Sequence, residues 1–421
     1  MKRLVWLVML MAALGTLALA QEPVTLRFRV HSSGVQFTAW ESLVAEFQAS
    51  HPGITIALEQ ITFEELFQSI QIGAASGDVP DIVHVYSLWG VELFKSGILA
   101  AAPADLQEQL RGEFYPAVLD GAIVDGQILG VPTEAQNYLL IYNKDLFRAA
   151  GLDPDSPPRT WDQLVDMAVQ LTKRDEAGNI VQYGYAFLQG WDSAVVHPWA
   201  ALLFQLGGRL FNADFTESTF NGPAGVAALE AELELFQAGA TDTNGSVFNF
   251  PNGTVAMMIM ASWYENDLKA AFGDRFQDVV GVAPIPLLSD AAQPATISYT
   301  WFTGVAASSP HQAEAWEFIR FLADQGAAGG TRAGDWATGA VGALPGGPGD
   351  AAAYADRTAD YFTAPFSAAL AVTVPEPNIA RAQEIKTVIW RAILSAWFGE
   401  RTAQEALDFA AEQVNEILAE L

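Results

Sequence analysis

The segment GVPTEAQNYLLIYNKDLF, residues 130–147, decides how the rest of the chain is organised. An apolar strand pattern over 127–131 is expected to end at Pro132, because proline has no N–H group to donate to a strand ladder. Polar residues follow, and a second strand pattern over 138–142 runs up to Asn143, a good cap for a short helix. A strand that stops, presents polar side chains and then resumes predicts a chain crossing between two sheets, and therefore the hinge of a two-lobed protein.

The polar side chains of this crossing are the first candidates for a binding site. We expect Glu134, Gln136 and Asn137 to face the gap between the lobes. The chain has 421 residues, more than one hydrophobic core usually supports, so two domains are expected. Strand and helix patterns alternate over residues 24–86, which predicts an α/β fold with a parallel sheet and helices on both of its faces.

The N-terminus has the pattern of a secretory signal peptide over residues 1–20. Lys2 and Arg3 precede an apolar run over 4–19, and Ala-Leu-Ala at 18–20 offers a cleavage site. The chain contains no cysteine, which excludes disulfides, thiolate metal sites and a lipid-bearing cysteine after the signal. We therefore expect a periplasmic protein that is exported without a lipid anchor.

Charge and motif content exclude several classes of function. The formal net charge of −28 would repel nucleic acids and anionic membranes. The sequence has no phosphate-binding loop, dinucleotide fingerprint, HExxH or GxSxG motif, and its five histidines are scattered. We therefore expect no cofactor, no metal and no catalytic residue. One enzymatic alternative stays open, a secreted carbohydrate-active hydrolase that would use Glu134 and Asp192 as an acid/base pair.

Aromatic residues gather where strands are expected to end. In parallel sheets ligands lie beyond the carboxyl ends of the strands, and such ends place His31, Ser33 and Tyr86 beside one cleft. Five tryptophans also lie in loops or at strand ends, where packing does not require them: Trp89, Trp191, Trp263, Trp301 and Trp336. Aromatic rings fit the apolar faces of a sugar ring, and polar side chains fit its hydroxyl groups. The pattern indicates a carbohydrate ligand.

Taken together, several short motifs resemble the extracellular solute-binding proteins of ABC importers, carbohydrate type, the group that includes maltose-binding protein. The resemblance covers nearly the whole chain after residue 20. It rests on these stretches, in this order: ASGDVPDIVHVY followed by SGIL, GVPTEAQNYLLIYNKDLF, TWDQL, GTVAMMIMASW, AWEFIRFL and TAQEALDFAAEQVNEIL.

The resemblance implies a two-lobed periplasmic binding protein fold, in which each lobe is a mainly parallel sheet flanked by helices and hinge strands join the lobes. The N-lobe would span 21–132 and 285–325, and the C-lobe 133–284 and 326–421. The ligand contacts of the family would fall on His31 to Ser33, Gln136, His197 and Trp263. An aromatic pair of maltose-binding protein is replaced by Lys386 and Thr387, which argues against a maltodextrin.

The expected function is therefore the capture of a sugar or oligosaccharide between two lobes and its delivery to the membrane permease of an ABC importer, by a monomer. An alternative within the same fold is a polyol or a glycerol phosphate, which would need a cation from Arg332, Arg381 or Lys386. The predicted ligand-binding residues are His31, Ser33, Tyr86, Trp89, Glu134, Gln136, Asn137, Trp191, His197, Trp263, Trp301 and Trp336.

Overall fold

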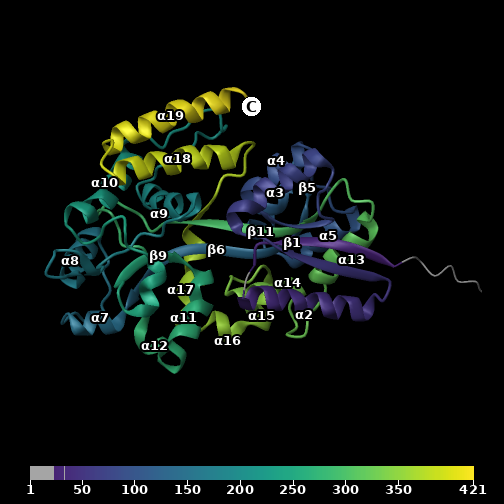
Figure 1. Cartoon of the computed structure of the whole chain (residues 1–421), viewed down its shortest axis with the longest axis horizontal. Coiled ribbons are helices and arrows are strands. Elements are labelled where there is room, and N and C mark those ends of the chain that lie inside the picture. Colours follow the sequence, from purple (N-terminus) through teal and green to yellow (C-terminus); the bar gives the residue numbers. More distant parts are fainter. Residues whose placement is uncertain (1–22, 33) are drawn as a thin grey trace, which may run out of the picture.

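The computed structural model describes residues 23–32 and 34–421 (Figure 1). The predicted signal peptide 1–20 and the predicted contact Ser33 lie outside these residues. Among the helices of the described part, none combines the length and the apolar character needed to cross a bilayer.

One sheet of eight strands connects the two halves of the molecule. Its hydrogen-bonded order is β10-β6-β11-β3-β1-β2, with β12 added to β11 and β9 to β6. Strands β1, β2 and β3 are parallel to one another, and β11 is antiparallel to both β3 and β6. The strands are β1 Val24–Val30, β2 Ile54–Gln60, β3 Ile82–Tyr86, β6 Gly130–Asn143, β9 Met257–Ala261, β10 Val280–Ala283, β11 Thr296–Val305 and β12 Thr373–Pro375. Two small hairpins pair β4 Ile123–Val124 with β5 Gln127–Ile128, and β7 Lys173–Arg174 with β8 Ile180–Gln182.

Strand β6 carries the chain from one half to the other without a break. Its first part pairs with β11, from Gly130 to Asn137, and its second part pairs with β9, from Tyr138 onward. The prediction that the strand stops at Pro132 was wrong, because Pro132 pairs with Phe302 of β11 and the ladder continues beyond a bulge at the next residue, Thr133. The predicted crossing is therefore one continuous strand of 14 residues, all of them buried. Its end is as predicted, because Asn143 accepts two backbone N–H bonds and caps the next helix.

Helices cover both sides of the sheet (Figure 1). We call the half of the molecule that contains β1, β2 and β3 the N-lobe, and the half that contains β9 and β10 the C-lobe. The helices before β11 are α2 Gly34–Ser50, α3 Phe63–Ser76, α4 Gly90–Lys95, α5 Ala104–Glu113, α6 Pro116–Leu119, α7 Lys144–Ala149, α8 Trp161–Leu171, α9 Asp192–Gln205, α10 Pro223–Gln237, α11 Glu265–Phe272 and α12 Phe276–Val279. The later helices are α13 Gln312–Ala323, α14 Arg332–Gly334, α15 Pro348–Ala353, α16 Ala355–Thr358, α17 Thr363–Ala369, α18 Ala382–Trp397 and α19 Ala403–Ala419.

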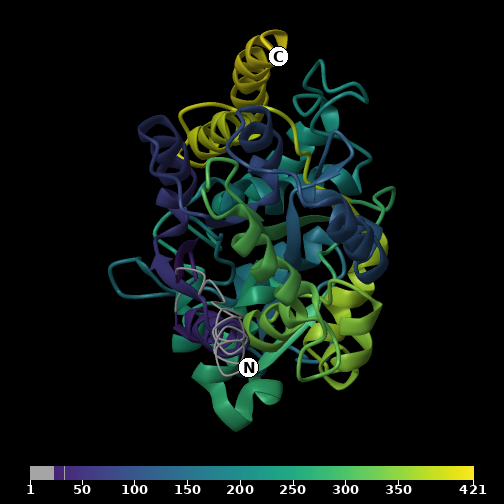
Figure 2. The same cartoon turned by 90° about the vertical axis from the view of Figure 1, so that its right-hand side faces the viewer.

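Each lobe has its own hydrophobic core. The C-lobe core surrounds β6 and β9 and includes apolar faces of α8, α9, α10, α18 and α19. The N-lobe core packs Phe28 of β1 against Trp40 of α2 and Phe318 of α13. Helices α18 and α19 lie together at the top of both views (Figures 1 and 2). The fold class follows the prediction, two α/β lobes joined by long hinge strands, while the exact lobe boundaries stay a prediction.

Candidate functional site

A cavity of about 370 Å³ lies beside the hinge strands and holds half of the predicted ligand-binding residues. Its N-lobe wall comes from the loop after β1, the start of α3 and the end of β3. Its C-lobe wall comes from the start of α9, from residues 262–264 and from α11. The floor is formed by β6 and β11. Side chains of both lobes therefore border one cavity, as the two-lobed prediction requires.

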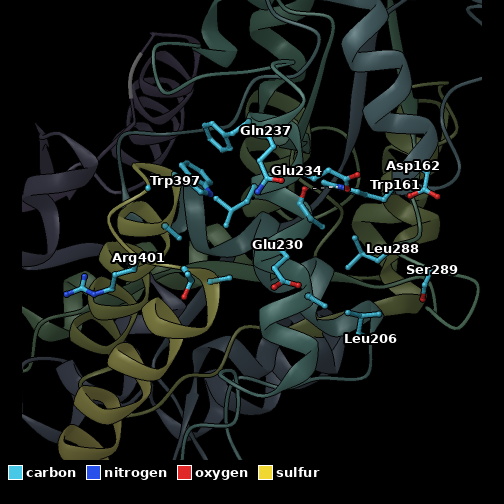
Figure 3. A pocket seen from close by; sticks show the side chains of 18 residues that line it. Trp161, Asp162, Leu206, Glu230, Glu234, Gln237, Leu288, Ser289, Trp397 and Arg401 are labelled. Atoms are coloured by element: carbon cyan, nitrogen blue, oxygen red, sulfur yellow. Dashed lines mark hydrogen bonds between the residues drawn. The ribbon is translucent and has the colours of Figure 1, made fainter.

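Two wider hollows contain none of the predicted residues. A groove of about 1000 Å³ lies on the C-lobe between α8, α10 and the turn that joins α18 to α19 (Figure 3). Its labelled side chains include Trp161, Trp397 and the carboxylates of Glu230 and Glu234. A second hollow of about 620 Å³ lies near β11 and β12 and shares Tyr299 with the cavity. We assign the candidate site to the smaller cavity because the convergent polar and aromatic groups are there.

An aromatic stack joins the floor of the cavity to its N-lobe wall. The ring of Trp301, in β11, stacks on His31 with centroids 4.1 Å apart and on Tyr86 with centroids 5.2 Å apart. Phe63, the first residue of α3, meets Trp191 of the C-lobe edge-on at 6.5 Å. Aromatic rings of the two lobes thus approach each other at the cavity, where they can enclose the apolar faces of a ligand.

A buried carboxyl group lies on the floor. Glu134 is 7% exposed, and its Oε2 accepts a bond of 3.2 Å from Nε2 of Gln136, which is itself held by Ser262. Residues two apart on a strand share a face, so both side chains point to the same side of β6. Burial raises the pKa of Glu134 to about 8, although the Gln136 bond opposes the shift. In the empty cavity Glu134 is therefore mostly protonated at pH 7.

A network of charged and hydroxyl groups lies directly behind the wall. Lys386 of α18 donates to Glu376 Oε1 at 2.8 Å, to Tyr86 Oη at 3.0 Å and to Ser193 Oγ at 2.7 Å. Nε2 of His197 lies 2.8 Å from Glu376 Oε1. Burial alone would raise the pKa of Glu376, but the Lys386 ammonium and His197 outweigh it and lower the value to about 2. Glu376 is therefore a stable carboxylate.

Three side chains could hold a metal ion. His31, His84 and Glu134 each offer one ligand atom, and these atoms lie within 4.8 Å of one another. Burial lowers the pKa of His31 to about 4 and also lowers that of His84, so both rings are neutral, as metal binding requires. Nε2 of His84 is, however, 2.9 Å from the hydroxyl of Thr133. The expectation of no metal stays a prediction.

Six of the predicted residues line the cavity. These are His31, Tyr86, Glu134, Trp191, Trp263 and Trp301. The remaining described ones lie elsewhere. Asn137 points to the opposite face of β6, where its Nδ2 donates to Phe366 O at 2.9 Å. Gln136 and His197 are fully buried beside the cavity and support Glu134 and Glu376.

Trp89 and Trp336 take part in packing and do not line the cavity. Trp89 stacks on Phe67, and its Nε1 donates to Gln383 Oε1 at 2.7 Å. Trp336 stacks on Trp40 at 4.5 Å within the N-lobe core. Asp192, the second member of the hydrolase alternative, is also absent from the lining. Its carboxylate accepts bonds from Gln383 and Ser193.

Several lining residues were not predicted. They are Gly34, Val35, Gln36, Phe63, Glu64, Tyr138, Ser193, Asn266, Asp267, Ala270, Tyr299 and Ala340. Tyr138 was visible in the sequence, because it is two residues beyond Gln136 and four beyond Glu134 on the same strand. Tyr299 carried no such signal, since its position depends on its pairing with Gln136.

Among the described residues, no lysine or arginine lines the cavity. The three cations proposed for a phosphate are engaged elsewhere. Arg332 pairs with Glu46 and stacks on Phe321, and Arg381 pairs with Glu384 and Glu420. Lys386 is neutralised by Glu376. The carboxyl groups of the lining are those of Glu64, Glu134 and Asp267, and of these Glu134 is mostly protonated at pH 7.

Comparison with known proteins places these features in a family. Residues 31–329 match the profile of the family described as bacterial extracellular solute-binding proteins. The sn-glycerol-3-phosphate-binding periplasmic protein UgpB of Escherichia coli is 26% identical, over 96% of this chain and 95% of its own length.

Two solved structures have the same fold. An ABC transporter solute-binding protein of Thermotoga lettingae bound to α-D-tagatose is 24% identical, with a TM-score of 0.82 over 94% of this chain and 99% of that chain. The cyclic α-maltosyl-1,6-maltose binding protein of Arthrobacter globiformis is 25% identical, with a TM-score of 0.74 over the same shares.

Proposed function

Because its match to the profile extends over most of the sequence, this chain belongs to the bacterial extracellular solute-binding proteins, and we propose that it captures a neutral sugar or oligosaccharide for an ABC importer. The observation that carries the proposal is the cavity at the hinge, with aromatic rings on both lobes and uncharged or acidic polar groups between them. Sugar-binding relatives of the same fold add support.

The chemistry of the cavity fits a sugar. Trp191, Trp263 and Trp301 offer flat apolar surfaces, and Glu134, Ser193 and Asn266 can exchange hydrogen bonds with hydroxyl groups. Leaving one buried polar group without a partner costs about 1–3 kcal/mol, so the polar groups select among sugars while the rings supply contact area. A cavity of about 370 Å³ is at the small end for ligand sites, which favours one or two sugar rings.

The same cavity offers little to a glycerol phosphate. A phosphate is ordinarily held by arginine, lysine or a helix N-terminus. The described part of the lining has carboxyl groups, a neutral histidine and no lysine or arginine, so an anion would meet repulsion and lose its hydration. An uncharged polyol remains compatible with the site.

Ligand capture would proceed by closure of the lobes about β6 and β11. Shifting an equilibrium from 99% open to 99% closed takes about 5.5 kcal/mol of preference for the closed form. A micromolar ligand supplies about 8 kcal/mol in total, so most of its contacts must exist only when both walls touch it. The division of the lining between two lobes and a hinge meets this requirement. The closed form would then present the ligand to a permease, with the binding protein acting as a periplasmic monomer.

A ligand screen tests the proposal. The purified protein is heated with maltose, mannobiose, D-tagatose, sorbitol and sn-glycerol 3-phosphate, each in separate samples, and hits are measured by calorimetry. We expect at least one sugar to raise the melting temperature and to bind one to one, because a ligand of the folded state stabilises it by mass action. A shift with sn-glycerol 3-phosphate and with none of the sugars would contradict the proposal.

The same samples separate binding from hydrolysis. After incubation the sugars are analysed by chromatography. A binding protein returns maltose and mannobiose intact, whereas the hydrolase alternative returns monosaccharides. Released monosaccharide that disappears in Glu134→Gln would replace the binding proposal with an enzyme.

A further inference from the structure

Lys386 is a buried cation that touches both lobes from behind the cavity wall. Only 4% of its side chain is exposed, and 5% of that of its partner Glu376. Its ammonium contacts Tyr86 at the end of β3 in the N-lobe and Ser193 in α9 of the C-lobe. Tyr86 and Ser193 line the cavity, whereas Lys386 does not. The cation therefore acts on any ligand through the two hydroxyl groups.

Counting hydrogens fixes the roles of these hydroxyls. Lys386 has three N–H groups, and all three are used, on Glu376, Tyr86 and Ser193. Tyr86 receives one of these bonds and donates its own hydrogen to Glu376 Oε2. Ser193 also receives one and donates its hydrogen to Asp192 Oδ1 at 3.2 Å. Both hydroxyl hydrogens are therefore bonded within the protein. The Ser193 oxygen keeps a lone pair for the ligand. The Tyr86 oxygen also lies 3.4 Å from Nε2 of His197, but the hydrogen of that nitrogen is directed to Glu376 Oε1 at 2.8 Å, so the tyrosine oxygen can still accept from a ligand.

A third hydroxyl of the lining is oriented in the same way. Nε2 of His197 lies close to the Glu376 carboxylate and so carries the ring hydrogen. Its Nδ1 is then an acceptor, and the hydroxyl of Tyr138 is 3.2 Å from it. The hydrogen of Tyr138 points inward, toward His197. Glu376 thus orients Tyr86 directly and Tyr138 through His197.

We propose that the Lys386–Glu376 pair sets the ligand selectivity of the cleft. Glu376 holds the hydrogens of Tyr86 and Tyr138 inward. Lys386 donates to the oxygens of Tyr86 and Ser193, so that this wall offers acceptors to hydrogen-bond donors of the ligand. The inference rests on the proposed function. It narrows the class of ligands to those that present neighbouring hydroxyl or amino groups to the wall formed by Tyr86, Ser193 and Tyr138. Groups that only accept, such as a phosphate, a carboxylate or an ether, lose affinity at this wall. Lys386 is a positioning residue, because it does not touch the ligand.

The charge of Lys386 does not attract anions strongly enough to offset the loss of affinity of groups that only accept hydrogen bonds. The charges of Lys386 and Glu376 are 2.8 Å apart, so at the distance of the ligand their fields largely cancel. Burying such a pair is not an efficient source of stability, because the loss of hydration offsets most of the attraction. Its orientation of three hydroxyl groups gives it a function that an apolar pair could not perform.

The test compares a double variant with the wild type on modified sugars. In Lys386→Met/Glu376→Leu both charges are replaced together by apolar side chains of similar size, which avoids an unpaired buried charge. The probes are whichever of maltose, mannobiose or D-tagatose binds the wild type, and its monodeoxyfluoro derivatives, in which fluorine replaces one hydroxyl and cannot donate. Affinities are measured by calorimetry. The surface pair variant Lys95→Met/Asp125→Leu is the matched control.

For the wild type and the control we expect at least one fluoro derivative to bind tenfold or more weakly than the parent sugar. In the double variant, where Tyr86 and Tyr138 can turn their hydrogens toward the ligand, the ratio of the two affinities should fall below threefold. If Lys386 and Glu376 only support the structure, the double variant should bind the parent sugar and its fluoro derivatives more weakly by the same factor, and the ratio of their affinities should stay as in the wild type. That result would overturn the inference. If none of the three sugars binds the wild type, the proposed function fails first and the inference falls with it.

Discussion

The buried carboxyl of Glu134 should make the empty protein less stable than it would be without this group. Glu134 lines the cavity and forms no ion pair with a lysine or arginine of the described residues. The substitution Glu134→Gln keeps the shape of the side chain and its bond to Gln136 while it removes ionisation. The chain also offers a matched control, because Glu232 in α10 is 1% exposed, bonds Trp397 and lies outside the cavity.

The size of the effect follows from the pKa. Burial raises the pKa of Glu134 from 4.5 to about 8, and burial raises that of Glu232 to about 8 as well. Between pH 4.5 and about pH 8 the folded protein binds more protons than the unfolded chain, so the free energy of unfolding falls as the pH rises. One pKa unit corresponds to about 1.4 kcal/mol, which gives a ceiling of about 5 kcal/mol above pH 8. Local relaxation and water in the cavity reduce this ceiling, and we expect Glu134→Gln to gain about 1–3 kcal/mol at pH 8 and almost nothing at pH 4.

Urea denaturation of the ligand-free proteins at pH 4, 6 and 8 measures this gain. Both Glu134→Gln and Glu232→Gln should become more stable than the wild type as the pH rises. Only Glu134→Gln should also weaken sugar binding, by about tenfold, because only it lines the cavity. If Glu232→Gln shows the pH-dependent gain and Glu134→Gln does not, Glu134 is solvated or paired in the empty protein and the reasoning about its burial is refuted.

Three further outcomes can be checked. Trp263→Ala should weaken sugar binding tenfold or more in calorimetry, since it removes an aromatic ring of the C-lobe wall; an unchanged affinity would exclude Trp263 from the site. Gly130→Ala should lower the free energy of unfolding by about 2–3 kcal/mol, because the added Cβ would lie 2.1 Å from Thr303 O in the β6–β11 pairing. Gly112→Ala changes an exposed position of helix α5 where the new Cβ meets nothing within 4 Å, so it should instead raise the free energy of unfolding by about 1 kcal/mol. If Gly130→Ala were the more stable of the two variants, the pairing of β6 with β11 at this position would be contradicted. Raising the salt concentration should leave the affinity for a neutral sugar nearly unchanged, because salt screens attraction between charges and the described lining has no lysine or arginine to attract an anion. A steep loss of affinity would indicate a charged ligand.

Local rules were enough to predict the two-lobed plan and some element ends. Asn143 was predicted to cap α7, and it does so through its side-chain oxygen. Helix α8 begins after Thr160 with a full capping box that includes Gln163. Such features depend on neighbours within four residues, so the sequence carries the whole signal.

The role of individual polar residues was harder to predict, because it depends on partners far away in the chain. Strand alternation alone would have separated Asn137 from Glu134 and Gln136, since odd and even positions face opposite sides. Lys386, in contrast, was considered as a phosphate ligand, and nothing near it in the sequence revealed that Glu376, Tyr86 and Ser193 use all of its hydrogens. Tertiary contacts decided its chemistry.

The positions of the tryptophans show why a place at the end of a strand is not enough to identify a ligand-binding residue. Trp301 faces the cavity because its cross-strand partner is Glu134, and directly opposed residues share one face of a sheet. On the other side of the bulge, Phe302 pairs with Pro132. The bulge at Thr133 changes the phase of β11 relative to β6, so that position 301 faces the same side as Glu134 in place of position 302. One inserted residue in the ladder therefore decides which aromatic ring meets the ligand, and apolar–polar patterns in the two separate strands do not contain that information.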